Sequence, residues 1–324
     1  FWERWMRELP TIQSLAKAKP ERVLKLWEGL GYYTRARNLQ KAAQMVCEKH
    51  YGKFPETFDA ILALPGIGRY TAGAICSIAF NQPKPILDGN VIRVLTRVFG
   101  ISENPREKKT NEHLWRLAGE LVCTADMGAS KNRNNCSPLN QSIMELGALI
   151  CTPRQPKCGE CPVKKSCVAL RENRIEELPN LEKKCAPTKR RFIAFVVEQN
   201  KKFFVQQRPD KAVNALLWEF PNVELNGDKS VLKNHPFRIS PEALPFCTIK
   251  HSITRYRITM DAFRAALSGN EKLSDGKWLR ISALQKLAFS SAHRQILEKL
   301  AGRKYFSSSQ TNSADRISAA RSTA

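Results

Sequence analysis

Four cysteines crowded into one short segment constrain the fold of this chain more than any other feature of its sequence. They are spaced as Cys151-x6-Cys158-x2-Cys161-x5-Cys167, and four thiolates this close together can ligate Zn²⁺ or a cubane iron–sulfur cluster. A structural zinc site usually uses two Cys-x2-Cys pairs, and this segment has only one. The remaining cysteines of the ten in the chain show no pairing pattern. The sequence therefore favours a reducing compartment and one thiolate-ligated metal site over a disulfide framework.

The charge balance indicates a polyanionic partner. The chain has 53 Lys and Arg against 30 Asp and Glu, a formal net charge of +23, and such an excess favours phosphate contacts and counterion release. The basic residues are spread along the chain and interleaved with aromatics, so nucleic acid is favoured over an acidic protein or an anionic membrane. No apolar run approaches the length of a membrane span, and the N-terminus does not resemble a signal peptide.

The order of apolar, polar and turn residues predicts two domains. Residues 1–125 read as successive helices, 126–138 as a polar surface loop, 139–151 as a further helix, and 171–191 as a charged linker. Residues 192–300 contain alternating segments around Gln199-Asn200, a hairpin signal, then strand candidates at 254–263 and 276–280 and a helix at 291–300. We therefore expect an α+β second domain, followed by a disordered tail over 301–324.

The segment Leu-Pro-Gly-Ile-Gly at residues 64–68 lies between two predicted helices, 57–63 and 69–80. Gly66 and Gly68 permit a tight hairpin and let backbone N–H groups approach an anion at a helix N-terminus; an ordinary helix–helix turn is the alternative. Followed by Arg69 and Tyr-Thr-Ala-Gly-Ala, the segment resembles the helix-hairpin-helix of the base-excision DNA glycosylase superfamily. Residues 86–94 are similar to the catalytic-aspartate segment of that superfamily, and residues 29–39 resemble a stretch typical of its MutY branch.

This resemblance extends from Phe1 to about residue 300, and through it the chain is identified as a member of the MutY adenine DNA glycosylase family. It implies an all-α helix-hairpin-helix glycosylase domain over 1–170, whose loop at 151–167 holds a [4Fe–4S] cluster through its four cysteines. It also implies an α+β Nudix-like lesion-recognition domain over 192–300. The cluster is expected to present the cations of its loop to the DNA backbone rather than to perform hydrolysis.

Asp88 precedes a predicted helix, where Asp is a favoured N-cap. The resemblance implies a second role, in which the carboxylate faces the sugar and stabilises the oxocarbenium-like cation as the N-glycosidic bond breaks. Both roles can hold at once, and Asn90 would help to position Asp88 or the attacking water.

Position 70 distinguishes two classes of enzyme. Superfamily members that also cleave the DNA backbone carry a lysine there, which attacks the sugar as a Schiff-base nucleophile. Here the residue is Tyr70, and a phenol cannot form an imine, so hydrolysis alone is expected. Tyr70 is then either a core aromatic or a hydrogen-bond partner near the target base or Asp88.

The resemblance also implies which residues bind DNA. Tyr32 would wedge into the base stack beside the lesion, as suits a protein that flips its target out of the duplex; packing in the core is the alternative. Arg35 and Arg37 would contact phosphates, unless they lie on a solvated helix face. The hairpin contributes the rest of the expected set, namely Gly66, Gly68 and Arg69.

Residues 217–222 (Leu-Trp-Glu-Phe-Pro-Asn) are similar to the Nudix-like domain with which MutY proteins read 8-oxoguanine. A working Nudix hydrolase needs a downstream acidic helix to hold Mg²⁺, and residues 223–245 contain no such pattern, so this domain is expected to bind and not to hydrolyse. In many family members a Phe-Ser-His triplet contacts the oxidised guanine. Ile253, Thr254 and Arg255 occupy the matching place: Thr254 keeps a hydroxyl and Arg255 keeps a donor, but the aromatic is lost.

The expected function is hydrolytic removal of adenine mispaired with 8-oxoguanine or guanine in double-stranded DNA, by a monomeric, monofunctional DNA N-glycosylase; in a bacterium it would be cytoplasmic and associated with the nucleoid. In the family an upstream glutamate protonates the adenine ring. Because the sequence opens on Phe1 within an amphipathic helical pattern, we expect it to begin downstream of that glutamate and to excise adenine slowly by itself. None of Glu3, Glu8 and Glu28 matches its context. The alternatives are a glycosylase/lyase and a lesion-binding protein without catalysis.

Overall fold

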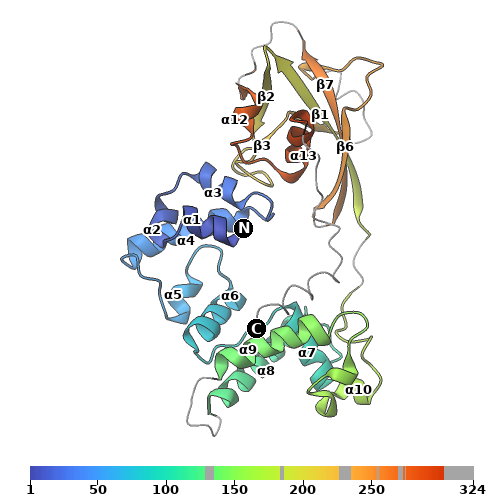
Figure 1. Ribbon diagram of the computed structural model, residues 1–324. Coiled ribbons are helices and arrows are strands. Elements are labelled where there is room, and N and C mark those ends of the chain that lie inside the picture. The colour runs from blue at the N-terminus through green and yellow to red at the C-terminus, as the bar shows by residue number, and fades with distance from the viewer. Residues whose placement is uncertain are drawn as a thin grey trace, which may run out of the picture. The chain divides into compact units, whose positions relative to one another are not determined.

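The chain folds as two units, one helical and one built on a β-sheet (Figure 1). Unit 1 comprises residues 1–10, 18–37 and 185–324, and unit 2 comprises 11–17 and 38–184. The computed structural model describes residues 1–127, 135–182, 186–225, 235–253, 255–268, 273 and 275–302. Thr254, most of the predicted 126–138 loop and nearly all of the predicted tail lie outside the described residues.

Unit 2 is made of helices joined by short turns. Two of its helices end in a π-helical turn, because the i→i−4 hydrogen-bond ladder widens there. The first residues of α4 belong to unit 1 and the rest to unit 2. The helices are α2 (Ile12–Lys17), α4 (Thr34–Lys49), α5 (Phe58–Leu62), α6 (Arg69–Ala74) with η1 (Ile75–Ala79), α7 (Gly89–Phe99), α8 (Lys108–Met127), α9 (Cys136–Glu145) with η2 (Leu146–Ile150), and α10 (Val168–Arg171).

Helix α7 is central to unit 2 and is closed at both ends by its own sequence. Asp88 caps its N-terminus, and Gly100, with φ of 68°, caps its C-terminus in the left-handed conformation that glycine adopts without strain. Its apolar face packs against α8 in a core that includes Val91, Leu95 and Leu114. Two arginines, Arg93 and Arg97, are buried on the same helix.

Unit 1 contains an eight-stranded sheet in which β1 runs parallel to β7 and the other strand pairs are antiparallel. The order is β3-β2-β1-β7-β5, with β4 paired to β1, β6 to β7 and β8 to β2. The elements are β1 (Thr188–Gln199), β2 (Lys202–Gln207), β3 (Trp218–Glu219), β4 (Asn222–Glu224), β5 (Phe237–Arg238), β6 (Cys247–Ile253), β7 (Tyr256–Leu267), β8 (Lys277–Leu279), α12 (Ile281–Leu284) and α13 (Ser291–Leu300).

Both faces of this sheet carry a core, because the central residues of β1 are buried on both sides. Ala194 and Val196 pack with Ile296 of α13 on one face. Ile193 and Phe195 pack with Phe237 on the other. At its N-terminal end β1 becomes exposed, so the sheet extends past its own core there.

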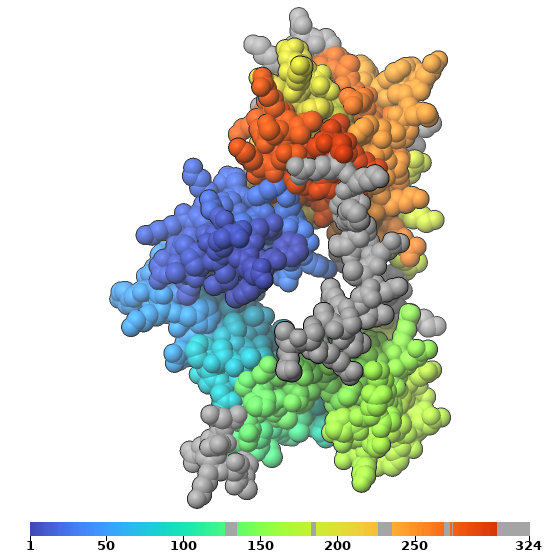
Figure 2. Space-filling view, in the orientation of Figure 1, coloured from blue at the N-terminus to red at the C-terminus, as the bar shows by residue number. Residues whose placement is uncertain are grey.

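The N-terminal helices α1 (Trp2–Glu8) and α3 (Pro20–Trp27) group with the sheet and not with the other helices. Lys25 Nζ donates to the Leu287 carbonyl at 2.8 Å, and the Phe289 N–H donates to Glu28 Oε1 at 2.9 Å. Figure 2 shows the N-terminal residues in blue against the orange and red residues that follow β8. This grouping differs from a first domain over 1–170, because these long-range bonds attach residues 18–37 to the end of the second domain.

Several predicted elements are confirmed. Asn200 and Lys201 have φ of 51° and 59°, as a two-residue β1–β2 hairpin requires, and the closing helix is α13. Strand β1 begins at Thr188, within the predicted linker, because its basic residues pair with β7. Among the described residues, no helix is long and apolar enough to cross a membrane.

Candidate active site and metal centre

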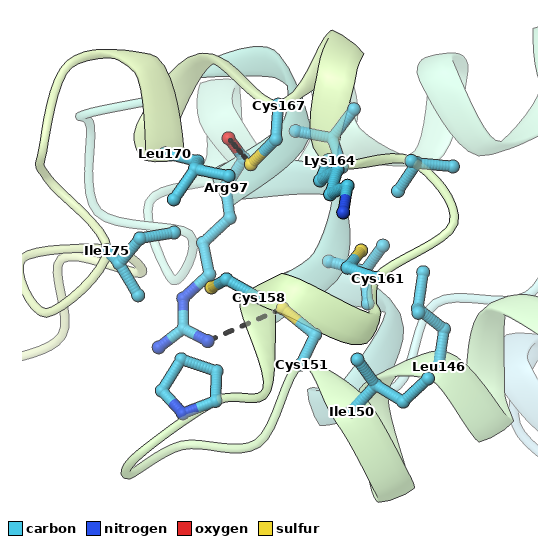
Figure 3. A pocket seen from close by; sticks show the side chains of 14 residues that line it. Arg97, Leu146, Ile150, Cys151, Cys158, Cys161, Lys164, Cys167, Leu170 and Ile175 are labelled. Carbon is cyan, nitrogen blue, oxygen red and sulfur yellow. Dashed lines mark hydrogen bonds between the residues drawn. The ribbon is translucent and has the colours of Figure 1, made fainter.

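The four cysteines of the 151–167 loop line one cavity in unit 2 (Figure 3). Cys151 follows η2, Cys158 begins a short 3₁₀ turn that Cys161 follows, and Cys167 immediately precedes α10. The remaining wall is largely apolar and comes from α7, η2 and the segment that follows the loop, with the side chains of Val94, Val98, Leu146, Ile150, Leu170 and Ile175. The loop therefore points its thiols at a common, apolar space.

The thiols fit an iron–sulfur cluster. Burial raises the pKa of the Cys158 thiol, and negative charge on Cys151, Cys167 and Cys161 raises it further, so a bound cation would favour the ionised form of Cys158. No three His, Cys, Asp or Glu side chains in the described ranges converge as a single-ion site requires. Four thiols that line one cavity match the ligand set of a cubane, in which each cysteine binds a different iron.

Arg97 joins α7 to this cavity. Its side chain is 2% exposed, and its Nη1 donates to Cys151 Sγ at 3.4 Å and to the Thr152 carbonyl at 2.9 Å, while Nε donates to the Leu178 carbonyl at 2.8 Å (Figure 3). These bonds tie the guanidinium of α7 to the cysteine loop and fix the position of the Cys151 sulfur. Arg97 is thus a positioning residue for the metal loop.

The predicted catalytic segment lies at the opposite end of the same helix. Asp88 Oδ1 accepts hydrogen bonds from the Asn90 and Val91 N–H groups at 2.9 and 2.8 Å, and Oδ2 accepts from Asn90 Nδ2 at 3.3 Å. The capping role of Asp88 is therefore present, and Asn90 orients its carboxylate. Three bonds from one helix end fix the direction in which the carboxylate points.

A chain of hydrogen bonds continues from Asn90 to the metal loop. Arg93 Nη2 donates to Asn90 Oδ1 at 2.8 Å and to the Gly147 carbonyl at 2.5 Å, and its Nε donates to the Cys151 carbonyl at 2.7 Å. A Cβ on Gly147 would lie 2.7 Å from Asn90 Cβ, so only glycine permits this approach. Arg93 therefore fixes the position of Asn90, beside Asp88, relative to Cys151 in the metal loop.

Tyr70 lies near Asp88. Burial raises the pKa of its phenol, and the negative charge of Asp88 raises it further, so the phenol keeps its proton at neutral pH and can donate a hydrogen bond. The same side chain packs at the edge of the core formed by α7 and α8. The core packing of Tyr70 is therefore present, and its hydrogen bond to the target base or to Asp88 stays a prediction.

The predicted hairpin forms between α5 and α6. Gly66 has φ of 80°, and a Cβ there would meet the Asn38 side chain at 2.6 Å, whereas Gly68 is the N-cap of α6 with extended backbone. The Arg69 guanidinium lies 4.1 Å from the centre of the Trp115 ring. Arg69 is exposed but already stacked, so its contact with DNA stays a prediction.

The four aromatic and basic residues of the 32–37 segment have different environments. Tyr32 is 77% exposed with φ of 47°, and the Arg35 guanidinium lies 5.7 Å from its ring centre, an arrangement suited to a wedge. Tyr33 is buried and its hydroxyl donates to the Phe289 carbonyl at 3.3 Å. Arg37 donates to the Ala215 carbonyl at 3.0 Å, so one nitrogen of its guanidinium already holds a hydrogen bond within unit 1.

Unit 1 contains a cavity beside Tyr32. It is lined by residues 29–34, 212–214, 251–253 and 290–292, so the exposed wedge segment and the end of β6 share one concave surface. His251 Nδ1 is buried there without a hydrogen-bond partner in the described part of the chain. Arg255 stays exposed, and its Nη2 lies 3.0 Å from the Tyr256 hydroxyl.

Two residues that hold the site together carried no role in the sequence analysis. Arg93 lay inside the catalytic-aspartate segment without a function, and Arg97 was not singled out. The available signal was their spacing of four, which places both on one face of a helix whose other residues are largely apolar. Buried arginines at that spacing indicate partners on a neighbouring segment.

Known protein families match both units. Residues 1–120 match the HhH-GPD superfamily of base excision DNA repair proteins, 151–167 match the iron–sulfur binding domain of endonuclease III, and 193–299 match the NUDIX domain. The expected fold class is therefore confirmed, and the cofactor of the cysteine loop is a [4Fe–4S] cluster.

Curated relatives identify the branch. The adenine DNA glycosylases of Buchnera aphidicola subsp. Schizaphis graminum, Rattus norvegicus and Arabidopsis thaliana are 38%, 34% and 37% identical to the chain over 92%, 91% and 77% of its length. The chain spans 85%, 67% and 45% of the lengths of these three relatives. Because the Buchnera relative is matched across most of its own length at this identity, the chain belongs to the adenine DNA glycosylase family.

Proposed function

We propose that this protein hydrolyses the N-glycosidic bond of adenine opposite 8-oxoguanine or guanine in double-stranded DNA. The observation that carries the proposal is the Asp88 carboxylate, fixed by three hydrogen bonds at the N-terminus of α7 with the Tyr70 phenol nearby. Family membership and the net charge of +23 support a DNA substrate.

The proposed reaction depends more on stabilising the positive charge that develops on the sugar than on a nucleophilic side chain. As the bond from the sugar C1′ to adenine N9 breaks, the electron pair leaves with adenine, which takes up a proton, and C1′ becomes cationic. Asp88 would stabilise that cation electrostatically, and water then adds to C1′ and loses a proton. Tyr70 offers no amine for an imine, which favours hydrolysis over strand cleavage.

The metal loop has a supporting role in this proposal. The four cysteines would hold the [4Fe–4S] cluster, which supplies a rigid cross-link between segments of unit 2. Arg93 and Arg97 bind this loop at Cys151, and Arg93 also binds Asn90, which orients Asp88. The residues that meet substrate are therefore positioned from the metal end of the helix.

The cavity beside Tyr32 supports recognition of the base opposite adenine. Its walls combine an exposed aromatic, the end of β6 and a buried imidazole nitrogen that has no hydrogen-bond partner among the described residues, which suits a flat heteroaromatic ligand with polar edges. Ile253, the first of the three residues that stand in place of the Phe-Ser-His triplet, lines this cavity.

Single-turnover excision tests the activity. We expect adenine release from 8-oxoguanine:adenine and guanine:adenine duplexes but not from 8-oxoguanine:cytosine, and at least about a hundredfold slower release by Asp88→Asn, because an amide cannot stabilise the cation as a carboxylate does. Borohydride should trap no covalent complex with the wild-type chain. Excision that survives Asp88→Asn, or a trapped complex, would contradict the assignment.

Lesion preference needs a point substitution rather than removal of the second domain, because residues 18–37 depend on that domain. Thr254→Val should narrow the affinity gap between the two adenine duplexes, while Thr188→Val, at the exposed start of β1, should leave it unchanged. An unchanged gap in Thr254→Val would remove Thr254 from lesion recognition.

A further inference from the structure

The exposed end of the sheet in unit 1 has a regular polar surface on the face that α13 does not cover. Figure 1 shows β1 and β6 continuing past α13 on either side of β7. In the register of these strands, Lys250 of β6, Thr259 of β7 and Arg191 of β1 form one row, and Ser252, Arg257 and Lys189 form the next. We call these six residues the basic sheet face.

Alternation along the strands places most of this face on the side of β6 opposite to His251 and Ile253. Successive side chains of a strand point to opposite sides of a sheet, so Lys250 and Ser252 lie on one side of β6 while His251 and Ile253 lie on the other. Residues 251–253 line the cavity beside Tyr32, so Ser252 borders both that cavity and the basic sheet face. The end of β6 therefore lines the cavity beside Tyr32 with one side and carries part of the basic sheet face on the other.

The charges on this face are of one sign. Lys189, Arg191, Lys250 and Arg257 are exposed, and the nearest carboxylate in the register, Asp261, is buried and bound by Arg191 Nη2 at 2.9 Å and by the Thr248 hydroxyl at 2.6 Å. Within the described ranges no carboxylate pairs with the other three cations. A face that only needed to be soluble would carry both signs.

We propose that the basic sheet face binds the phosphate backbone of duplex DNA, which deepens the proposed function and rests on it. Cations and hydroxyls interleaved on one surface are the groups that contact phosphate and sugar without reading sequence. The two rows are about 6.8 Å apart and neighbouring strands about 4.8 Å apart, so the four cations can meet more than one phosphate at once. Backbone contacts there would hold the duplex while the opposite side of β6 meets the lesion.

The test measures binding of the complete chain to undamaged duplex and to 8-oxoguanine:adenine duplex as a function of salt. The variant is Lys250→Gln with Arg257→Gln. The matched control is Lys201→Gln with Lys202→Gln, which removes the same charge from exposed positions at the hairpin end of the sheet. Arg257→Lys keeps the charge, and thermal unfolding confirms that each variant is folded.

Losing two phosphate contacts should lower the slope of log K against log salt by about 1.8, so that between 50 and 200 mM salt the wild type loses roughly tenfold more affinity than the variant. The control should lose much less slope, and Arg257→Lys should keep the wild-type slope. Equal slopes for the variant and the control would overturn the proposal.

The outcomes separate this proposal from the proposed function. If the wild-type chain binds neither duplex, the DNA substrate itself is wrong. If it binds both with a steep salt slope that Lys250→Gln with Arg257→Gln does not change, only the basic sheet face is wrong. Binding of polyglutamate by the wild type that the double variant loses, with DNA binding intact, would assign the face to an acidic protein instead.

Discussion

The two units pair the arginines that they bury wholly or in part in different ways. In unit 1, Arg208 pairs with the buried Glu219, and Arg294 lies 3.7 Å from Glu28. In unit 2, Arg93 and Arg97 are buried on backbone carbonyls and the Cys151 sulfur, and in the described part of the chain neither forms an ion pair with a carboxylate. Unit 1 therefore supplies carboxylate counter-charges to its arginines, whereas the buried arginines of unit 2 depend on carbonyls and, for Arg97, on a sulfur of the metal loop.

The largest expected effect comes from removing a metal ligand. Cys151→Ser should bleach the absorbance near 400 nm expected of a thiolate-ligated cluster and destabilise unit 2 by about 5 kcal/mol or more, since the binding energy of a structural metal site is also folding energy. Hydrogen exchange resolved by peptide measures this, and protection in β1 and β7 should persist.

Cys123→Ser is the control, because Cys123 is exposed and lies outside the loop. It should leave the colour and both units unchanged. Equal loss of protection in the two units after Cys151→Ser would show that unit 1 also depends on the metal loop for its stability.

Arg97 gives the next largest effect. Arg97→Leu removes a fully buried cation that satisfies two carbonyls and a sulfur, and it should cost about 3–5 kcal/mol in unit 2. Arg97→Lys keeps the charge without the planar fork and should cost less. Denaturation followed through the cluster absorbance reports both, and identical costs would mean that charge alone matters.

Glu219 is the counterpart in unit 1. Glu219→Gln leaves Arg208 without an anion and should cost about 2 kcal/mol, seen as faster exchange in β2 and β3 with the cluster absorbance intact. Bleaching of the cluster in this variant would break the contrast between the units.

A pH dependence should also be confined to unit 1. Burial lowers the pKa of His293 to about 3, with further lowering by the charge of Arg208. The folded-state pKa lies below that of a free imidazole, near 6.5, so the unfolded chain takes up the proton first as pH falls. The neutral His293 imidazole therefore makes its full contribution to the free energy of unfolding above pH 6.5. As the pH falls from 6.5 to 3, that free energy decreases by about 1.4 kcal/mol per pH unit.

Exchange in α13 between pH 7 and 5.5 measures this loss. His293→Gln should flatten it, since glutamine keeps an acceptor for the Phe220 N–H, which donates to His293 Nδ1 at 3.2 Å. An unaltered pH profile in that variant would place the acid sensitivity elsewhere.

Local patterns predicted local structure well. The cysteine spacing predicted a shared cavity, the Asp88 cap predicted where α7 begins, and Gln199-Asn200 predicted the β1–β2 hairpin. Each depends on residues close in the chain, whose turn and capping chemistry can be read directly.

Long-range partners could not be predicted in the same way. Nothing near Arg97 in the sequence indicates the Leu178 carbonyl, and nothing near Lys25 indicates Leu287. Such bonds depend on packing between distant segments, which one sequence does not reveal. The grouping of residues 18–37 with the sheet was missed for this reason, as was the second use of Arg37.

The bonds that join the start of unit 1 to its end also fix an order of events during synthesis. Lys25 and Leu287 are separated by 262 residues, and at about 5–20 residues per second roughly 13–50 seconds pass between their appearance on the ribosome. During that interval α3 has no acceptor at position 287, and Glu28 and Tyr33 have no partner at Phe289. Unit 2 can be completed meanwhile, so residues 18–37, which are made before most of unit 2, reach their native contacts after it.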